Sequence, residues 1–455
     1  MAQSLSSPPL KQLLRDISSG AVHTVVLVFP DMQGRWMGKR ATGRHFADTV
    51  AAHGTHACAY LLTVDMEMDP VPGYELTSWA RGYQDFLLTP DYATIRALPW
   101  SPGSVQIICD LHGDDHQPIS VAPRQVLKDQ LARAAKLGFS FKMASELEFY
   151  LFRDSYDSAQ KKKWHDLEHI GSYIEDYHIL QGAKEEFVVG EIRNQMEKAG
   201  IPVETSKGEW GPGQHEINLG YSTPLEMADW HTFYKHGAKE IAIAKGVSMT
   251  FMAKFDSKLA GSSCHIHTSL WDKTGRKPLF AGAKEPTPLF RHFLAGQMAL
   301  AREFSYFYAP TINSYKRYQS ATFAPTRIAW ARDNRTCGFR TVGEGGGLRI
   351  ENRIPGADVN PYLAFAATIA AGLHGIERKL EPPKEFHGNA YEANTVQPVP
   401  KTLTEAIGLL EKSQAARAAF GETVFAHYLH TARAEQAAFD RAVTCWERER
   451  NFERI

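Results

Sequence analysis

The sequence predicts an α+β protein built from two domains. Its 455 residues exceed what one simple core organises, since a single core stops growing at about 250–300 residues. Short apolar runs broken by Gly, Pro and Asp fill residues 21–110, whereas strand-like runs alternate with long helical patterns farther along. We therefore expect a small sheet-rich domain at 1–115 and a large mixed domain at 116–455.

The small domain is predicted from three apolar runs, VHTVVLVFP, HACAYLL and SVQIICDL. Each is short enough for one strand and is bounded by residues that favour turns. The polar stretch DLHGDDHQPIS follows, and then Pro123 begins a helical pattern that Gly138 ends. The domain boundary is therefore placed near residue 115.

The large domain is predicted from four strand-like runs, FSFKMASELEFYLF, HEINLGY, CHIHTSLW and LRIENRI. Between and after them, helical patterns are expected at about 224–245, 289–307, 360–380, 402–418 and 422–449. Asn360 and Pro361 form a cap and first-turn pair for the segment YLAFAATIAAGL. Because that segment is apolar on nearly every side, we expect it to be a buried helix.

The composition argues against nucleic-acid binding and membrane binding. Lys plus Arg equals Asp plus Glu at 51 each, so no net field attracts nucleic acid or an anionic membrane. The five cysteines are scattered without a C-x-x-C pair, which is typical of reduced thiols in the cytosol. The start lacks a secretory pattern, and no run of about 18 apolar residues occurs. We expect a cytoplasmic protein that acts on small molecules.

Carboxylates recur on one face of the predicted strands. In SELEFYLF a strand places Glu146 and Glu148 on the same face, with apolar residues behind them. In GEWGPGQHEI, Glu209 and Glu216 flank a tight turn, so these two carboxylates can converge as well. An exposed sheet face explains either pair taken alone, and only their combination favours a metal site.

Histidines and a further glutamate follow the same period of two. His265, His267 and Ser269 share one face of CHIHTSLW, and Glu351 lies between two arginines in LRIENRI. Five carboxylates with at least one imidazole suit magnesium or manganese, whereas zinc favours more His and Cys. Although the histidines can also be structural, a two-metal site uses all of these residues.

Arginines occur in the polar, turn-containing segments INSYKR and WARDNRTCGFR. Arg317, Arg335 and Arg340 lie near the ends of these segments. A guanidinium can direct two donors onto a carboxylate or phosphate and stabilise charge that grows during phosphoryl transfer. Metals together with arginines indicate a polyphosphate and an acid as ligands, although each arginine alone can equally be a surface ion-pair partner.

These blocks, in this order, resemble the glutamine synthetase family and its bacterial type I branch. The segments SELEFYLF, EWGPGQHEINL, GSSCHIHTSLW, INSYKR, NRTCGFR, RIENRIPGADVNPYLAFAATIAAGL and DFLLTPDYATIRALPW each resemble a family block. The resemblance implies a small β-grasp N-terminal domain and a catalytic domain with a curved antiparallel sheet and surrounding helices. It also implies a homo-oligomer, a dodecamer of two stacked hexamers with sites shared between subunits.

The resemblance implies residue roles by position. One metal is expected on Glu148, Glu209 and Glu216, and a second on Glu146, His265 and Glu351. Glutamate is expected at Arg317 and Arg353, with Gly261 and Glu209 nearby, and the phosphates at Arg335, Arg340 and Arg349. ATP is expected against His267, Ser269 and Tyr221, with Arg340 and Arg349 at its phosphates.

The implied reaction joins the side-chain carboxylate of glutamate to nitrogen. ATP phosphorylates that carboxylate, and an amine displaces phosphate from the γ-glutamyl phosphate, with magnesium or manganese neutralising the oxygens. In the family an aspartate of the neighbouring subunit deprotonates the amine. By position, Asp65 is the candidate for this base, but the family's Asp-Gly-Ser-Ser sequence is absent here. Glu67 and Asp69 are therefore alternatives, and all three can also be residues of a turn without a catalytic role.

One departure from the family bears on the amine. Phe323 stands where glutamine synthetases carry a glutamate that helps bind ammonium, and a phenyl ring offers apolar surface instead. Together with the GSSCHIH form, this predicts a glutamate–amine ligase that uses an alkylamine, arylamine, amino alcohol or polyamine. Tyr177, in the loop at 160–180, is a further candidate for the substrate pocket.

Two other functions stay open at this level. An ordinary glutamine synthetase that uses ammonium is the first, with Phe323 then a core aromatic next to an altered loop. A non-catalytic structural relative is the second, although such a protein is expected to have lost metal ligands, and all six matching positions are intact.

Overall fold

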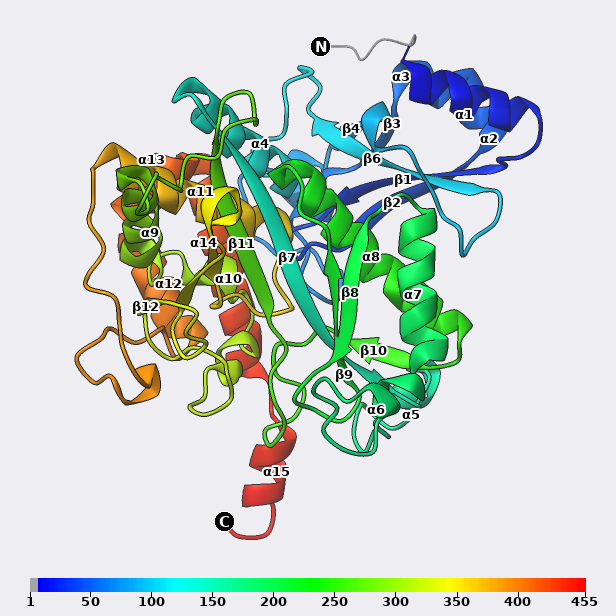
Figure 1. The fold of residues 1–455 in the computed structure, drawn as a ribbon. Helices are drawn as coiled ribbons and strands as arrows, with labels where there is room; N and C mark the ends of the chain where they lie inside the picture. Colours follow the sequence, from blue (N-terminus) through cyan, green and yellow to red (C-terminus); the bar gives the residue numbers. More distant parts are fainter. Residues whose placement is uncertain (1–6) are drawn as a thin grey trace.

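The computed structural model describes residues 7–455, which form two sheets and a set of helices around them (Figure 1). Residues 1–6, part of the start in which no secretory pattern is expected, lie outside the described residues. One continuous apolar core runs from Leu10 to Ala432 through both sheets. The α+β prediction is confirmed.

The first sheet has six strands in the order β2-β1-β6-β4-β3, with β5 paired to β6. Its strands are β1 (Thr24–Pro30), β2 (Trp36–Thr42), β3 (Thr55–Cys58), β4 (Asp85–Pro90), β5 (Arg96–Ala97) and β6 (Ser104–His112). The central pair β1 and β6 is parallel, with Thr24 opposite Ser104, and the other pairs are antiparallel. Helix α1 (Pro8–Ser18) covers this sheet because Leu10 and Leu13 enter the core.

The second sheet has eight strands in the order β12-β13-β14-β11-β7-β9-β8, with β10 paired to β7. Its strands are β7 (Phe139–Phe152), β8 (Val203–Gly208), β9 (Gln214–Leu219), β10 (Ser248–Thr250), β11 (Cys264–Asp272), β12 (Trp330–Arg332), β13 (Phe339–Val342) and β14 (Arg349–Asn352). All pairs except β12 and β13 are antiparallel. The four predicted strands of the large domain are thereby confirmed as β7, β9, β11 and β14.

Helices surround the second sheet. They include α4 (Pro123–Lys136), α5 (Tyr156–Lys161), α6 (Ile179–Ala183), α7 (Glu186–Lys198), α8 (Pro224–Ala244), α9 (Pro288–Leu300), α10 (Ser305–Tyr308), α11 (Pro361–Glu377), α12 (Leu403–Lys412), α13 (Gln414–Phe420) and α14 (Glu422–Arg441). Helix α15 (Cys445–Asn451) extends away from the rest of the chain (Figure 1). Helix α11 is buried as predicted, with Asn360 accepting from the amide of Tyr362. It crosses α9 so closely that a Cβ on Gly296 would lie 2.2 Å from the carbonyl oxygen of Ala371.

Three predicted helices are interrupted. The pattern at 289–307 divides into α9 and α10, and the pattern at 402–418 divides where Ser413 adopts an extended backbone and caps α13. The pattern at 422–449 divides at Ala442, after which Thr444 and Glu447 form a capping box for α15. Side-chain caps satisfy the free amides of a new helix start, so they stabilise a break within an otherwise continuous apolar pattern.

A buried arginine links the first sheet to the helices α4 and α8. Arg124, on α4, donates to Asp110 on β6 at 2.7 Å, to Asp91 at 2.9 Å and to Asp229 on α8 at 2.9 Å. Burial opposes the charge of Arg124, but Asp229 and Asp110 raise its pKa well above the ordinary value. The boundary near residue 115 stays a prediction, since this contact and the shared core cross it. Among residues 7–455 no helix is long and apolar enough to cross a membrane.

Candidate active site

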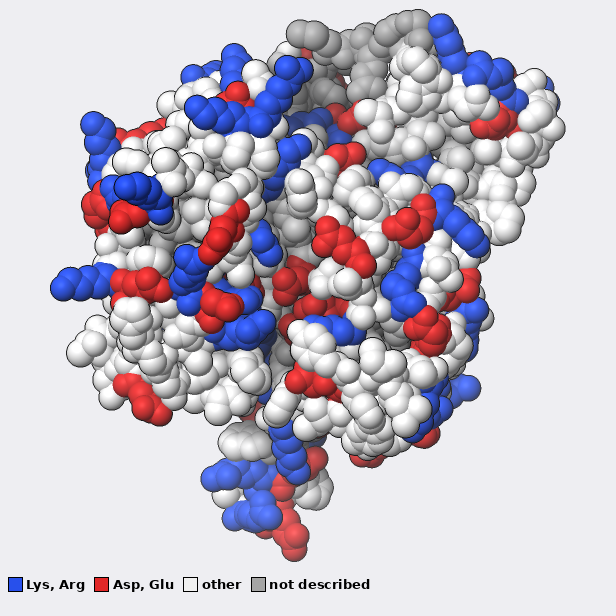
Figure 2. Space-filling model, viewed as in Figure 1, with Lys and Arg blue, Asp and Glu red and all other residues white. Residues whose placement is uncertain are grey.

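A cavity of about 1170 Å³ opens beside the second sheet. In Figure 2 acidic and basic side chains surround a hollow near the middle of this face, over the central strands. The predicted residues that line the cavity are Glu146, Glu148, Tyr177, Glu209, Glu216, Gly261, His265, Arg317, Phe323, Arg335, Arg340 and Arg353. Residues far apart in sequence therefore share one cavity with mixed charge.

Strand register brings the polar residues together. Glu146 on β7 lies opposite His265 on β11, and Glu148 lies opposite Glu216 on β9. Directly opposed side chains lie about 4.5–5.5 Å apart at Cβ and point to the same face. Since alternate residues of β7 share that face, Glu146 and Glu148 connect two groups of side chains.

The first group consists of Glu148, Glu209 and Glu216, which offer oxygens within 4.8 Å of one another. Burial, with the neighbouring carboxylates, raises the pKa of Glu209 to about 7 and the pKa of Glu216 well above its ordinary value. Glu148 is held in place by the amide of Ser263, which donates to it at 2.8 Å. Three acids this close favour a bound cation between them.

The second group gathers around Glu146 and Glu351. His265 Nδ1 lies 3.1 Å from Glu146 and 3.4 Å from Glu351, while His267 Nε2 lies 2.6 Å from Glu146. Burial opposes ionisation of Glu351, but Arg353 and the two histidines lower its pKa to about 2. Glu146, His267 and Glu351 offer atoms within 4.8 Å of one another, so either histidine can complete this group.

Two arginines form the buried wall of the cavity. Arg317 donates to the carbonyls of Ile354 at 2.8 Å and Arg353 at 3.0 Å, which fixes its guanidinium. Arg353 pairs with Glu351, while its buried Nε has no hydrogen-bond partner among the described residues. A Cβ on Gly261 would lie 2.7 Å from Cγ of Arg317, so only glycine allows this approach. A free donor beside a cavity suits an anionic ligand.

Two further arginines lie toward the open side. Arg340 Nη1 donates to Glu351 at 2.9 Å, and its Nε donates to Asp333 at 3.0 Å. Arg335 lines the cavity and is exposed, without a hydrogen bond to the described residues. One arginine is therefore fixed, and the other is free to follow a ligand.

The residues expected at the nucleotide are less closely gathered. Arg349 Nε donates to His267 Nδ1 at 3.2 Å, so these two lie together at the edge of the second group. Ser269 accepts from the indole of Trp271 at 2.8 Å, and Tyr221 is 64% exposed. None of these four residues lines the described cavity. Only His267 touches a residue that does, Glu146.

Aromatic rings border the cavity near the first group. Phe323 is 49% exposed and meets Trp210 edge-on, with ring centroids 5.8 Å apart. The carbonyl of Phe323 accepts from Arg353 at 3.4 Å, and its φ of +59° is rare for a residue with a side chain. Tyr177 lines the same cavity and is 66% exposed. The cavity thus offers apolar surface beside its charged floor.

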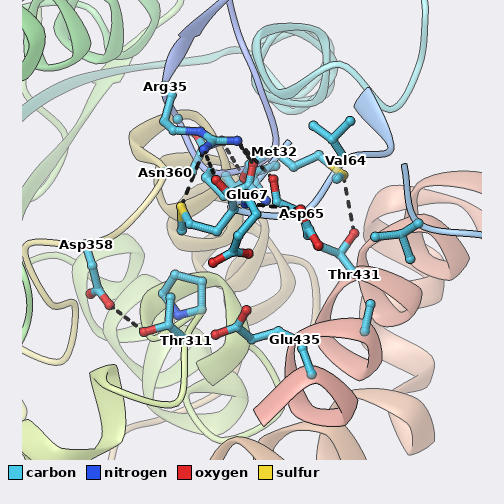
Figure 3. Close-up of a pocket in the computed structure, with 18 of the residues that line it drawn as sticks. Met32, Arg35, Val64, Asp65, Glu67, Thr311, Asp358, Asn360, Thr431 and Glu435 are labelled. Carbon is cyan, nitrogen blue, oxygen red and sulfur yellow. Dashed lines mark hydrogen bonds between the residues drawn. The ribbon is translucent and has the colours of Figure 1, made fainter. Parts of the chain in front are cut away.

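The candidate base lies elsewhere in the chain. Asp65 and Glu67 line a second cavity, of about 1190 Å³, together with Glu435 of α14 (Figure 3). Asp65 accepts the amides of Glu67 at 3.1 Å and Asp69 at 2.8 Å, so it stabilises its own turn. Within one chain, Asp65 does not line the cavity that holds the carboxylate groups.

Sequence reasoning missed a buried group at the wall of the first cavity, which His215 lines. Glu175, Glu185 and His215 lie together, with His215 Nε2 3.1 Å from Glu175 and in contact with Glu185. The two carboxylates raise the pKa of His215 to about 9 although burial acts the other way. The amide of Gly213 donates to Glu175 at 2.6 Å, so this group supports the turn that carries Glu209 and Glu216. No local sequence pattern predicts this group, because Glu185 and Glu175 lie 30 and 40 residues before His215.

The comparisons with known proteins agree with this geometry. Residues 120–451 match the family described as glutamine synthetase, catalytic domain. The chain belongs to the glutamine synthetase family. It is 51% identical over 451 residues to the gamma-glutamylethanolamide synthetase of Streptomyces coelicolor, covering 99% of this chain and 97% of the relative. It is 38% identical over 452 residues to a glutamate–isopropylamine ligase of a Pseudomonas species, covering 97% and 98%.

A solved structure has the same fold over nearly the whole chain. A chain solved as a GmaS/ADP complex superimposes with a TM-score of 0.85 at 29% identity, covering 97% of this chain and 99% of the other. In sequence, glutamine synthetases themselves also match: that of Thermus thermophilus is 35% identical over 385 residues, covering 80% of this chain and 84% of the relative. This chain is accordingly a carbon–nitrogen ligase of a family that uses ATP and divalent metals.

Proposed function

We propose that the protein forms a γ-glutamyl amide from L-glutamate and a primary amine, with ATP as the energy source. The observation that carries this proposal is the aromatic pair Phe323 and Trp210, which lines the same cavity as the carboxylate groups and the arginines. Two relatives named for ethanolamide and isopropylamine chemistry support an alkylamine or amino alcohol as the substrate. Ordinary glutamine synthesis is the less favoured alternative.

The carboxylate groups suit divalent metal ions. Glu148, Glu209 and Glu216 supply only oxygen, and Glu146 and Glu351 add two carboxylates beside an imidazole. Such ligands favour magnesium or manganese, and burial together with the neighbouring carboxylates raises the pKa values of Glu209 and Glu216, so a divalent cation would stabilise their charged forms. We infer two ions per chain, which would neutralise phosphate oxygens when ATP is present.

The arginines have distinct roles in this proposal. Arg317 and Arg353 would hold the carboxylates of glutamate, since both are fixed and buried beside Gly261. Arg340 and Arg335 would stabilise charge on the transferred phosphoryl group. His267, Ser269, Tyr221 and Arg349 would line the nucleotide at the outer end of the same sheet face.

The amine must lose a proton before or during attack on the γ-glutamyl phosphate. We infer that a neighbouring subunit of a stacked-hexamer dodecamer supplies the base from its copy of the segment 65–69. The location of Asp65 at a second cavity supports this, because one chain does not bring Asp65 to the carboxylate groups. Glu67 and Asp69 remain alternatives, since Asp65 already accepts two amides. Sedimentation measurements test the assembly.

An amine panel tests the function. ADP release is measured with glutamate and ATP against ammonium, ethylamine, isopropylamine, ethanolamine, putrescine and aniline, and each amide is identified by mass. We expect at least one alkylamine or amino alcohol to exceed ammonium in kcat/KM. A higher kcat/KM for ammonium than for every amine would instead establish a glutamine synthetase. Chelation of divalent ions should stop ADP release with every amine.

Phe323 is the specific link between structure and amine choice. Phe323→Glu replaces apolar surface by a charge at the same place, so the preference should move toward ammonium. Phe323→Leu is the matched control and should keep the preference for amines, because it keeps an apolar side chain. An unchanged preference in Phe323→Glu removes Phe323 from the specificity argument.

A further inference from the structure

A segment outside the cavity runs along the part of the chain that carries Arg335. Residues 383–399, named the strap from here on, form no helix or strand apart from the single turn Ala390–Glu392, and Figure 1 shows them as an outer orange loop beside β12. The amide of Phe386 donates to the carbonyl of Trp330 at 3.0 Å, and the indole of Trp330 donates to the carbonyl of Pro383 at 2.7 Å. The strap is therefore bonded to the strand that precedes the Arg335 turn.

The strap also bonds to both neighbours of Arg335. The side-chain amide of Asn334 donates to the carbonyl of Gly388 at 2.9 Å, and the backbone amide of Ala390 donates to the hydroxyl of Thr336 at 3.0 Å. Within the turn, the Thr336 hydroxyl donates to the side-chain oxygen of Asn334 at 2.7 Å. This hydroxyl is donor and acceptor at once, so it connects the backbone on either side of Arg335 to the strap.

The strap and the Arg335 turn share a small apolar cluster that is separate from the main core. The cluster consists of Ala329, Ala331, Cys337 and Ala390, with Phe386 and Val396 packed against it. Ala390 belongs to this cluster and also bonds to Thr336, so the strap and the turn form one local unit. A change within this unit can therefore move the turn while the main core keeps its packing.

The side chain of Arg335 is free although its backbone is held. It lines the cavity and is exposed, without a hydrogen bond to the described residues. Two residues earlier, Asp333 has a φ of +49°, and its carboxylate accepts from Nε of Arg340 at 3.0 Å. A backbone of this kind persists only where the surrounding structure holds it. A fixed backbone with a free guanidinium suits a group that meets its ligand during the reaction.

We propose that Thr336 is a positioning residue for phosphoryl transfer, because its hydroxyl ties the backbone beside Arg335 to the strap and so fixes the point from which the guanidinium reaches. This inference rests on the proposed function, in which Arg335 stabilises charge on the transferred phosphoryl group. Thr336 and the strap touch no substrate in this proposal and act through Arg335. Substrate binding should therefore be spared when the connection is lost.

Thr336→Val tests the role, since it removes the hydroxyl and keeps the shape of the side chain. With the preferred amine of the panel, kcat should fall by about tenfold, the equivalent of one lost hydrogen bond in the transition state. KM for glutamate and for the amine should stay within about twofold. Thr336→Ser restores the hydroxyl and should restore kcat.

Thr274→Val is the matched control. Thr274 also donates its hydroxyl hydrogen to a side chain two residues earlier, that of Asp272 at 2.8 Å, but in a turn outside the described lining of the cavity. The same chemical group is thus removed from the same local arrangement. This variant should keep the wild-type kcat.

A double-mutant cycle shows whether Thr336 acts through Arg335. Arg335→Ala should lower kcat by itself, and adding Thr336→Val should lower it no further, because the group that Thr336 positions is gone. Independent losses would multiply instead. The kcat of the double variant would then equal the wild-type value divided by both separate fold-losses.

A second measurement reports the contact without turnover. Hydrogen exchange of the Ala390 amide should be faster in Thr336→Val than in the wild type, since that amide loses its acceptor, and Thr336→Ser should exchange at the wild-type rate. Mass spectrometry of peptides that cover the strap measures this exchange. Thr336→Ala replaces Thr336→Val in every measurement if the latter does not fold, as judged by thermal melting.

The outcomes separate this inference from the proposed function. An unchanged kcat in folded Thr336→Val, a rise in KM in place of the fall in kcat, or multiplied losses in the cycle overturns the positioning role and leaves the proposed amide synthesis intact. Unchanged exchange at Ala390 overturns it as well, because the connection to the strap is then absent. A wild-type preference for ammonium over every amine overturns the proposed function, and the cycle is then measured with ammonium.

Discussion

Arg340 and Glu351 are directly opposed on the neighbouring strands β13 and β14, and Nη1 of Arg340 donates to Glu351 at 2.9 Å. Glu351 is fully buried and also pairs with Arg353. One carboxylate therefore neutralises two guanidinium groups of the cavity. The integrity of the anion-binding wall depends on this residue.

Glu351→Gln should lower the free energy of unfolding by about 3 kcal/mol, because it leaves buried guanidinium charge uncompensated. Urea denaturation measures the change. Glu344→Gln is the control, since Glu344 pairs with Arg332 at the surface and is 81% exposed. Its loss should stay under about 1 kcal/mol. Equal losses in both variants would show that burial of Glu351 has no special effect.

Gly261→Ala should displace Arg317, because the new Cβ would lie 2.7 Å from Cγ of Arg317 and 2.6 Å from the carbonyl oxygen of Ala253. Misplacing a binding group by about 1 Å can cost on the order of 10²-fold in rate, so kcat/KM for glutamate should fall strongly. Gly408→Ala is the control, with no atom within 4 Å of its Cβ on α12. Steady-state kinetics measure kcat/KM for glutamate in both variants. A wild-type value in Gly261→Ala would contradict the steric argument.

Arg124→Met should destabilise the chain by about 3 kcal/mol or more, since it removes the cation that Asp91, Asp110 and Asp229 share. Arg133→Met provides the comparison on the same helix, because Arg133 pairs with Glu377 at a partly exposed position. Chemical denaturation of the two variants should therefore give clearly different midpoints. Similar midpoints would mean that the three carboxylates tolerate the loss of their cation.

His427 should make stability fall at acid pH. Burial lowers its pKa to about 3 in the folded chain, whereas an unfolded histidine titrates near 6.5. The unfolded state therefore binds the extra proton as pH falls below about 6.5, at up to about 1.4 kcal/mol per pH unit. His427→Gln should remove this contribution between pH 6.5 and 5.

The control for His427 changes packing without changing a titratable group. Met32→Leu alters the sulfur that lies 3.0 Å from His427 Nε2, so it should shift stability by a similar amount at each pH. Denaturation curves at several pH values compare the two variants. If the free energy of unfolding of His427→Gln falls with pH as steeply as that of the wild type, other groups produce the acid sensitivity.

Much of the site could be predicted because period-two alternation fixes which residues share a strand face. Glu146 and Glu148 were placed correctly by that rule alone. Alternation alone does not predict the register between distant strands. Glu146 and His265, which pair across β7 and β11, are 119 residues apart. The buried group of Glu175, Glu185 and His215 was missed because its members are separated along the chain. The α+β fold was predicted from the same alternation together with the helical patterns.

The interrupted helices show a different limit. Apolar periodicity continues across Ser413 and Ala442, so a pattern search alone extends the helix. The sequence TCWE at 444–447 does hold the signature of a capping box, and reading it would have predicted the start of α15. Caps decide where helices begin, whereas periodicity decides only that they form.

The separation of Asp65 from the carboxylate groups has a consequence for inheritance as well as for chemistry. Under the proposed assembly, a defect in the segment at 65–69 silences the site of the adjoining subunit and leaves the site of its own chain untouched. Each chain then folds by itself, whereas each active site needs residues from two chains. Cells that express two different defective copies could regain activity from mixed rings.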